Sequence, residues 1–191
     1  INELHRYLPQ RASDSRAWDY WFELHARAVI GETKRPEAPD QAQHWEWLRA
    51  QLPGHPIYMQ GRFDDIPASV MFPVDRIVQD LGARKYFTST IGFMIAWAIW
   101  KGAEKISLYG IDLASDVEYL YQKPNAEYWV GQAEARSIPV YATDKSALLK
   151  QTHLYGYEDE PDPGPITQGI LKQLIDRTRG EHDKAIAAAN T

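Results

Sequence analysis

YFTSTIGFMIAWAIWKGAEKISLYGID, from Tyr86 to Asp112, carries the strongest structural signal in this chain. It begins as a polar turn, continues as an apolar run typical of a buried helix, stops at Gly102 and ends in a buried strand. A helix followed by a strand is half of a βαβ unit, in which ligands bind where strands end and helices begin. The hydroxyl residues Thr88 to Thr90 at the helix start and Asp112 at the strand end are therefore expected at one edge of the sheet.

Strand and helix patterns alternate along the rest of the chain. Apolar runs predict strands at 20–25, 56–60, 106–111 and 139–142. Apolar spacing and capping residues predict helices at 2–8, 39–51, 73–81, 88–101, 118–136, 146–150 and 167–189. The helix at 118–136 has an alternative start at Pro124, because proline suits a first helical position. Residues 61–73 are predicted to be irregular, and 156–165, acidic with three prolines, to be a linker.

This alternation predicts an α/β fold. We expect it to be Rossmann-like, with a mostly parallel sheet, helices on both faces of the sheet and an additional C-terminal helix. The strands at 106–111 and 139–142 are apolar on both faces, as buried parallel strands are. Residues 1–155 are expected to form a nucleotide-binding domain and 156–191 a linker with the last helix. Asn2 already resembles a helix cap, so the first strand and its phosphate-binding turn are expected before Ile1.

The composition of the chain restricts its function classes. It has 191 residues, a net charge of −5 and no run of Lys or Arg, which disfavours binding to nucleic acid. It has no cysteine, which excludes disulfides, thiolate metal sites and cysteine nucleophiles and fits a cytoplasmic protein. No signal peptide is visible. The longest apolar run, Ile91 to Trp100, is half of the ~20 residues that span a bilayer, so no membrane partner is expected.

The residues at the two ends of the central motif have alternative interpretations. Thr88, Ser89 and Thr90 lie where free N–H groups and the helix dipole favour an anion, but Thr88 or Ser89 could simply be the N-cap of the helix. The two roles are compatible. Asp112, which follows Gly110, could hold a ribose hydroxyl, a metal ion or an acceptor hydroxyl. It could also be a turn residue bonded to its own backbone.

Candidates for acid–base chemistry lie mainly beyond this strand. Tyr119 and Tyr121, in the segment EYLYQ, could contact a base or sugar, or pack with exposed hydroxyls. His153, in a loop after the last strand, is the best candidate for a general acid or base, although a loop histidine is often only exposed. His25 ends a predicted strand and could line the edge of the sheet. The histidines have neither HxH nor HxxxH spacing, so no metal site is predicted.

The motifs around the central helix and strand resemble two related families. They are Phe87-Thr88-Ser89-Thr90, Ala96, Ala98, Gly102, Glu104-Lys105-Ile106 and Leu108-Tyr109-Gly110-Ile111-Asp112. This pattern resembles the bacterial family 42 sialyltransferases. It is also similar to the domain of archaeal 6-hydroxymethylpterin diphosphokinases, a Rossmann-like group common in phage and prophage genomes. Residues 118–141 resemble phage members of that group, and outside 86–141 the resemblance is faint.

The sialyltransferase resemblance implies roles for particular residues. Ser89, Thr90 and Asn2 would hold the cytidine nucleotide. The catalytic tyrosine of the family, two residues beyond the Gly-Ile-Asp aspartate, is Ala114 here. A second catalytic tyrosine would correspond to Tyr119 or Tyr121, and the catalytic histidine to His153. The diphosphokinase resemblance instead implies a metal-binding acidic cluster, for which the candidates are Asp112, Asp116 and Glu118.

Together these features predict a nucleotide- or nucleotide-sugar-binding protein that transfers a glycosyl or phosphoryl group, with Mg²⁺ as a candidate co-ligand. The catalytic candidates are Asp112, His153, Tyr119 and Tyr121, and the binding candidates are Asn2, Thr88, Ser89, Thr90, Gly110 and Glu118. The alternative is a non-catalytic nucleotide-binding or phage accessory protein, which Ala114 favours. The apolar stripe from Ile166 to Ile175 could dock on the domain or form a homo-oligomer.

Overall fold

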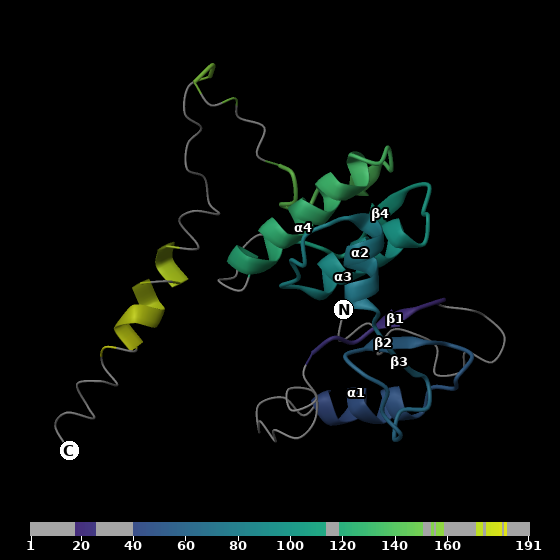
Figure 1. Ribbon diagram of the computed structural model, residues 1–191. Helices are drawn as coiled ribbons and strands as arrows, with labels where there is room; N and C mark the ends of the chain where they lie inside the picture. The colour runs from purple at the N-terminus through teal and green to yellow at the C-terminus, as the bar shows by residue number, and fades with distance from the viewer. Residues whose placement is uncertain are drawn as a thin grey trace. The chain divides into compact units, whose positions relative to one another are not determined.

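The computed structural model describes residues 18–25, 40–113, 119–150, 154, 156–158, 171–173, 175–180 and 182. The chain divides into two compact units, residues 1–85 and 86–191. Each unit combines helices with a small parallel sheet, so the predicted α/β class is confirmed (Figure 1). The predicted domain boundary after residue 155 stays a prediction. The predicted helix at 2–8 and any strand before Ile1 lie outside the described residues.

The first unit contains a three-stranded parallel sheet in the order β1-β2-β3. Its elements are β1 (Trp21–Phe22), α1 (Asp40–Arg49), β2 (Ile57–Met59), β3 (Ser69–Met71) and α2 (Val74–Leu81). Trp21 lies opposite Ile57, and Ile57 lies opposite Ser69 on the next strand. Since β1 and β2 are parallel and α1 connects them, β1–α1–β2 is a βαβ unit.

Aromatic and aliphatic side chains form the core under this sheet. Trp45 and Leu48, three residues apart on α1, are buried against Ile57 and Met59 of β2. Helix α1 therefore covers one face of the sheet (Figure 1). This agrees with the helix predicted at 39–51, whose apolar spacing placed Trp45 and Leu48 on one face.

Strand β3 corrects the prediction that residues 61–73 are irregular. Its pairing with β2 supplies backbone hydrogen bonds that outweigh the weak strand propensity of this proline-flanked segment. The turn before it is closed by Ser69, whose Oγ accepts from Phe63 N at 2.8 Å and donates to Phe63 O at 3.1 Å. The helix predicted at 73–81 is confirmed as α2, and Gly82 ends it in the left-handed conformation (φ 57°), as predicted.

Among the described residues up to 150, the second unit contains two helices and a two-stranded parallel sheet. Its elements are α3 (Thr90–Trp100), β4 (Ile106–Leu108), α4 (Tyr119–Glu134) and β5 (Val140–Ala142). Ile106 lies opposite Val140, and α4 connects the two strands, so β4–α4–β5 is a second βαβ unit. Helix α3 packs against α4.

Three predictions for this unit are wrong. The helix predicted at 118–136 is confirmed as α4, but its alternative start is wrong, because Pro124 lies inside the helix. Residues 146–150 are not helical: Leu148 and Leu149 form a turn, and Leu149 lies in the left-handed region (φ 56°), where a helix cannot continue. The strands are not buried on both faces: Ser107 is exposed, and Tyr141, its partner in the register, is 60% exposed. A two-stranded sheet with one uncovered face does not require apolar residues on that face.

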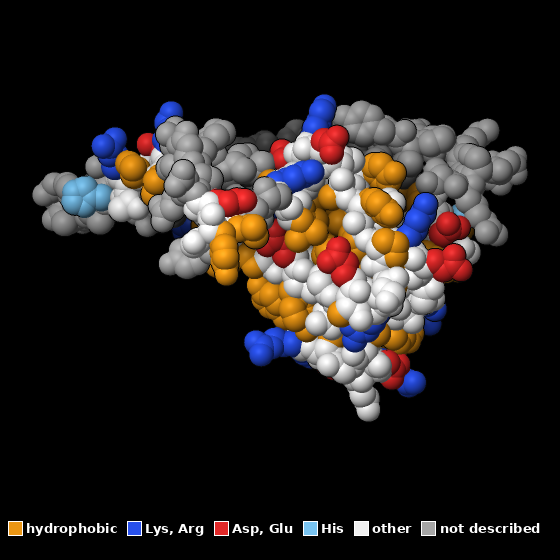
Figure 2. All heavy atoms as spheres, turned by 90° about the horizontal axis from the view of Figure 1, so that it is seen from above, with side chains coloured by type: hydrophobic (Ala, Val, Ile, Leu, Met, Phe, Trp, Pro, Cys, Tyr) orange, Lys and Arg blue, Asp and Glu red, His pale blue; other side chains and the backbone are white. Residues whose placement is uncertain are grey.

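The surface and the C-terminal segment complete the described structure. On the face drawn in Figure 2, Lys and Arg side chains stand apart from one another among hydrophobic and acidic ones. Residues 171–173, 175–180 and 182 are helical, within the helix predicted at 167–189, and Leu171 and Ile175 are about half exposed. Within the described part of the chain, every helix is too short or too polar to span a membrane.

Candidate functional site

Two groups of hydrogen-bonded polar residues, each with buried members, stand out among the described residues. In the first unit, Glu23 lies between His25 and His44, and we call these three residues the Glu23 cluster. In the second unit, hydrogen bonds connect Tyr86, Ser89, Asn125 and Trp129, which we call the Asn125 cluster. The first contains a charged group and the second is neutral.

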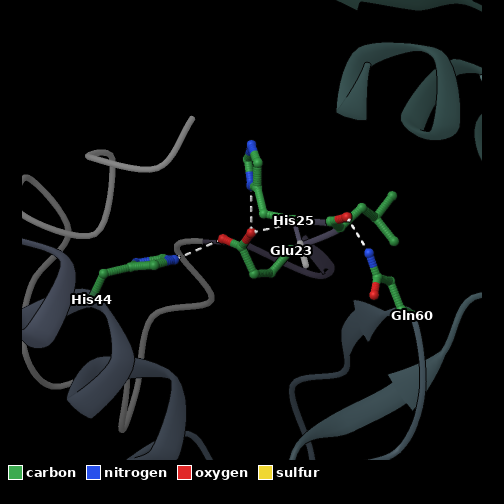
Figure 3. A network of polar contacts seen from close by, with 5 residues as sticks. Glu23, His25, His44 and Gln60 are labelled. Atoms are coloured by element: carbon green, nitrogen blue, oxygen red, sulfur yellow. Dashed lines mark hydrogen bonds and ion pairs between the residues drawn. The ribbon is translucent and has the colours of Figure 1, made fainter. Parts of the chain in front are cut away.

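The Glu23 cluster lies at the carboxyl end of β1. The backbone N–H of Glu23 donates to Tyr58 O of β2 at 2.9 Å, so the pairing of the two strands extends one residue beyond β1. Beyond that, Gln60 Nε2 donates to Leu24 O at 3.0 Å and holds the two strand ends together (Figure 3). This is the edge at which ligands bind in open parallel sheets.

Both carboxylate oxygens of Glu23 are bonded to imidazole rings. His25 Nδ1 lies 2.6 Å from Oε1, and His44 Nε2 lies 2.7 Å from Oε2 (Figure 3). The backbone N–H of His25 also donates to Oε1 at 3.3 Å. His44 comes from α1, and its ring stacks on that of Trp47 at an interplanar angle of 10°. The cluster thus connects the end of β1 to the crossover helix.

The electrostatics of the cluster keep Glu23 ionised. Burial alone would raise the pKa of this carboxyl, but the hydrogen bonds and positive charges of His25 and His44 outweigh burial and lower its pKa from 4.5 to about 2. An ionised carboxylate can only accept hydrogen bonds. His25 Nδ1 and His44 Nε2 must therefore both carry protons, which also fixes the tautomer that each ring adopts whenever it is neutral.

The two histidines differ in exposure. The side chain of His25 is 39% exposed, that of His44 only 7%, and that of Glu23 only 1%. Among the described residues, no group of three or more His, Cys, Asp or Glu side chains is arranged to hold a metal ion. Both Glu23 oxygens already accept imidazole N–H groups.

The Asn125 cluster shows where the predicted phosphate-binding hydroxyls lie. Ser89 is the N-cap of α3: its Oγ accepts from Gly92 N at 3.3 Å and donates to Asn125 Oδ1 at 2.9 Å. Asn125 Nδ2 and Trp129 Nε1 both donate to Tyr86 O at 2.8 Å. The capping interpretation of Ser89 is therefore confirmed, and its contact with a ligand stays a prediction.

Close packing of α3 against α4 surrounds this cluster. A Cβ at Gly92 would overlap Asn125 Oδ1, so only glycine fits at position 92 unless the hydrogen-bonded side chain of Asn125 moves. Thr88 is also tied to α4, since its Oγ1–H donates to Tyr121 O at 2.6 Å. Thr90 is the first residue of α3 and is half-buried.

Asp112 lies in the same unit as the Asn125 cluster, but in the loop that follows β4. Gly110 turns the chain after β4 in the left-handed region (φ 69°), and Asp112 follows with an exposed side chain. Its backbone carbonyl accepts from Ala147 N at 2.7 Å, which joins the loops that follow β4 and β5. Within the described residues, no hydrogen bond or ion pair joins Asp112 to Thr88, Ser89 or Thr90.

The other predicted site residues are only partly visible. Tyr121 is 66% exposed on α4, and Tyr119 is the first residue of that helix. The predicted residues Asn2, Glu118 and His153 lie outside the described part of the chain. For all of these, a role in binding or catalysis stays a prediction.

Glu23 and His44 were not predicted from the sequence as site residues. A signal for Glu23 was present, because Trp21-Phe22-Glu23-Leu24-His25 places a carboxylate and an imidazole two residues apart, on the same side of an extended segment. His44 carries no such local signal. It reaches Glu23 only because α1 packs beside β1, which is a tertiary contact between residues 21 positions apart.

Comparison of the chain with family models, with curated proteins and with solved structures finds no match. The geometry of the described residues and the sequence pattern are therefore the basis for assigning a function.

Proposed function

We propose that this chain is a nucleotide- or nucleotide-sugar-binding protein that transfers a glycosyl or phosphoryl group. The observation that carries the proposal is the position of Asp112: its exposed carboxylate lies where the loops after the parallel strands β4 and β5 are joined by the Asp112 O–Ala147 N bond. The carboxyl ends of parallel strands are the usual ligand position in α/β folds, and an acidic residue there commonly bonds a ribose hydroxyl.

The local backbone supports this proposal. Gly110, in the left-handed conformation, brings the backbone of the turn to the surface without a side chain, which allows a ligand to approach closely. The β4–α4–β5 connection is the βαβ unit from which Rossmann-like folds are built. A Rossmann-like arrangement is accordingly part of the proposal.

A non-catalytic nucleotide-binding protein is the second candidate. Thr88 and Ser89 donate their hydroxyl protons to Tyr121 O and Asn125 Oδ1, so neither hydroxyl proton is available to a phosphate unless an internal bond breaks. The resemblance also places Ala114 where a catalytic tyrosine would stand. The alanine at this position favours binding without chemistry, and the bonded hydroxyls leave contact with the nucleotide mainly to other groups of the site.

Thermal unfolding with a ligand panel tests the proposal. The panel is CMP, a CMP-sugar and ATP, each with and without Mg²⁺. A nucleotide at ~100 times its Kd should stabilise the protein by about 2.7 kcal/mol. The Asp112→Asn variant should lose most of this stabilisation. Glu104→Gln is the matched control, because Glu104 is an exposed carboxylate just before the amino end of β4, the strand that Asp112 follows.

The outcomes separate the candidates. Stabilisation by the CMP-sugar that depends on Asp112, together with turnover of the sugar, supports a glycosyltransferase. Stabilisation by ATP only with Mg²⁺ supports phosphoryl transfer. Binding without turnover supports the non-catalytic protein. If no nucleotide stabilises the chain, or if both variants respond equally, the proposed site is wrong.

A further inference from the structure

In the part of the chain that the structure describes, two tyrosines lie on the exposed face of the sheet in the second unit. Burial alternates along β4: Ile106 and Leu108 are buried, and Ser107 between them is exposed. Tyr141, the partner of Ser107 in the register, is 60% exposed. Tyr109 follows Leu108 directly and is 78% exposed. Because side chains alternate along an extended chain, Tyr109 belongs to the face of Ser107 and Tyr141, at the carboxyl end of β4.

Tyr109 is part of the same loop as the proposed nucleotide site. Gly110, in the left-handed conformation, comes next in the chain, and the exposed carboxylate of Asp112 follows two residues later. The Asp112 O–Ala147 N bond holds this loop against the loop that follows β5. An exposed aromatic ring and an exposed carboxylate therefore lie three residues apart, at the edge where parallel sheets bind their ligands.

The exposure of Tyr109 distinguishes it from tyrosines that pack within the same unit. Tyr86 and Tyr128 are half-buried and meet edge to face, with ring centroids 5.6 Å apart. The ring of Tyr109 instead presents most of its surface to solvent. A flat aromatic surface of this kind stacks on nucleobases, and the affinity gained depends little on which base is bound, because every base has a π face.

We propose that Tyr109 stacks on the base of the bound nucleotide while Asp112 bonds its ribose. This inference rests on the function proposed above and adds the group that recognises the base. The charge of the loop supports this orientation, because a neutral base beside Tyr109 avoids the repulsion that a phosphate would meet from the carboxylate of Asp112. The phosphate end of the nucleotide is accordingly directed away from this loop.

Isothermal titration calorimetry of the full chain, with CMP and with ATP plus Mg²⁺, tests the proposal. Tyr109→Phe keeps the ring and removes the hydroxyl, Tyr109→Leu keeps an apolar side chain without an aromatic face, and Tyr109→Ala removes both. Tyr157→Ala is the matched control, since Tyr157 is 91% exposed and lies beyond β5 in the chain. Urea unfolding without nucleotide measures the stability of each variant.

We expect Tyr109→Phe and Tyr157→Ala to bind as tightly as the wild-type protein. Tyr109→Ala should raise the Kd by about tenfold or more, and Tyr109→Leu should lie closer to Tyr109→Ala than to wild type. The increase should be similar for each nucleotide that binds, because stacking does not select a base. Since Tyr109 is exposed, its substitutions should leave the free energy of unfolding without nucleotide nearly unchanged, which a structural role of the ring would not.

The results distinguish failure of this inference from failure of the proposed function. If Tyr109→Ala binds like wild type while Asp112→Asn loses binding, the nucleotide site stands and Tyr109 is not part of it. If Tyr109→Phe loses as much affinity as Tyr109→Ala, the hydroxyl is the contact and stacking is wrong. If the wild-type protein binds neither nucleotide, the proposed function and this inference are both wrong. If Tyr109→Ala does not fold, the comparison of Tyr109→Phe with Tyr109→Leu decides.

Discussion

The Glu23 cluster and the Asn125 cluster use buried hydrogen bonds for different purposes. In the Asn125 cluster every described group is neutral, and the bonds join the turn before α3 to α4. In the Glu23 cluster an ionised carboxylate is buried between two titratable rings, one of them 39% exposed. Burying a charge is costly unless it is paired, whereas neutral groups need only satisfied hydrogen bonds.

This difference teaches how to tell a structural polar cluster from a candidate site. A structural cluster is closed, and its members are fixed by close packing, as Gly92 and Asn125 are. A cluster suited to chemistry keeps one titratable member within reach of solvent while its partners are buried. Perturbed charges at such positions are the usual mark of functional sites.

The largest expected difference between the two clusters is in how their contribution to stability changes at acidic pH. The folded-state pKa of Glu23, about 2, lies below its ordinary value of 4.5, so the unfolded chain binds a proton at higher pH than the folded chain. The stabilisation from Glu23 is therefore fully present above about pH 4.5 and is lost as the pH falls toward 2, with a total of about 3 kcal/mol.

Urea unfolding at a series of pH values, for the wild-type protein and Glu23→Gln, measures this difference. The two free-energy curves should converge as the pH falls. Glu104→Gln, at an exposed position, serves as the control and should follow the wild-type curve. If removal of Glu23 leaves the acid dependence unchanged, the cluster is not charged in the way the structure indicates.

A smaller effect on stability should come from adding a methyl group at Gly92, where α3 lies against Asn125 of α4. In Gly92→Ala the new methyl group would meet Asn125 Oδ1 at 2.2 Å, and we expect a loss of about 2 kcal/mol in the free energy of unfolding despite the better helix propensity of alanine. Gly131→Ala is the control, since a Cβ at position 131 of α4 meets nothing within 4 Å. That change should stabilise the protein by up to about 1 kcal/mol. Equal effects of the two changes would contradict the close approach of α3 to α4.

The smallest effect on stability should come from removing the N-cap of α3, Ser89. Ser89→Ala removes the bond from Gly92 N and leaves Asn125 Oδ1 without its described donor, and it should cost about 1 kcal/mol in urea unfolding. Ser107→Ala, on the exposed face of β4, should change stability by less than ~0.5 kcal/mol. A neutral Ser89→Ala would contradict the prediction, because it would mean that the two bonds of the hydroxyl contribute little to stability.

Local patterns predicted the helices and strands better than the contacts between them. The apolar run from Ile91 to Trp100, its serine cap and the stop at Gly102 specify α3 through nearby residues, and the structure agrees. Strand β3 was missed because its partner β2 lies about a dozen residues earlier and its own residues carry little strand signal. The prediction that β4 is buried on both faces was wrong, because the sequence does not reveal how many strands or layers surround a strand.

For the candidate site, too, the sequence predicted local positions better than contacts between distant residues. Ser89 and Asp112 were located by short motifs, and their positions at a helix start and after a strand are as expected. The sequence could not show that the Ser89 hydroxyl bonds Asn125, 36 residues away, or that His44 reaches Glu23. Tertiary packing decides such contacts. It also decides whether a hydroxyl at a helix start serves as an N-cap or is available to bind a ligand.

The contact between Gly92 and Asn125 has a consequence for the evolution of this chain. Asn125 fills the space that a side chain at position 92 would need, so a larger residue at position 92 requires a smaller one at position 125. In divergent sequences with this helix pair, alanine or serine at position 92 should appear together with a smaller residue at 125, and glycine at 92 should accompany asparagine. Such paired substitution would record the contact between α3 and α4 in sequences whose structures are not known.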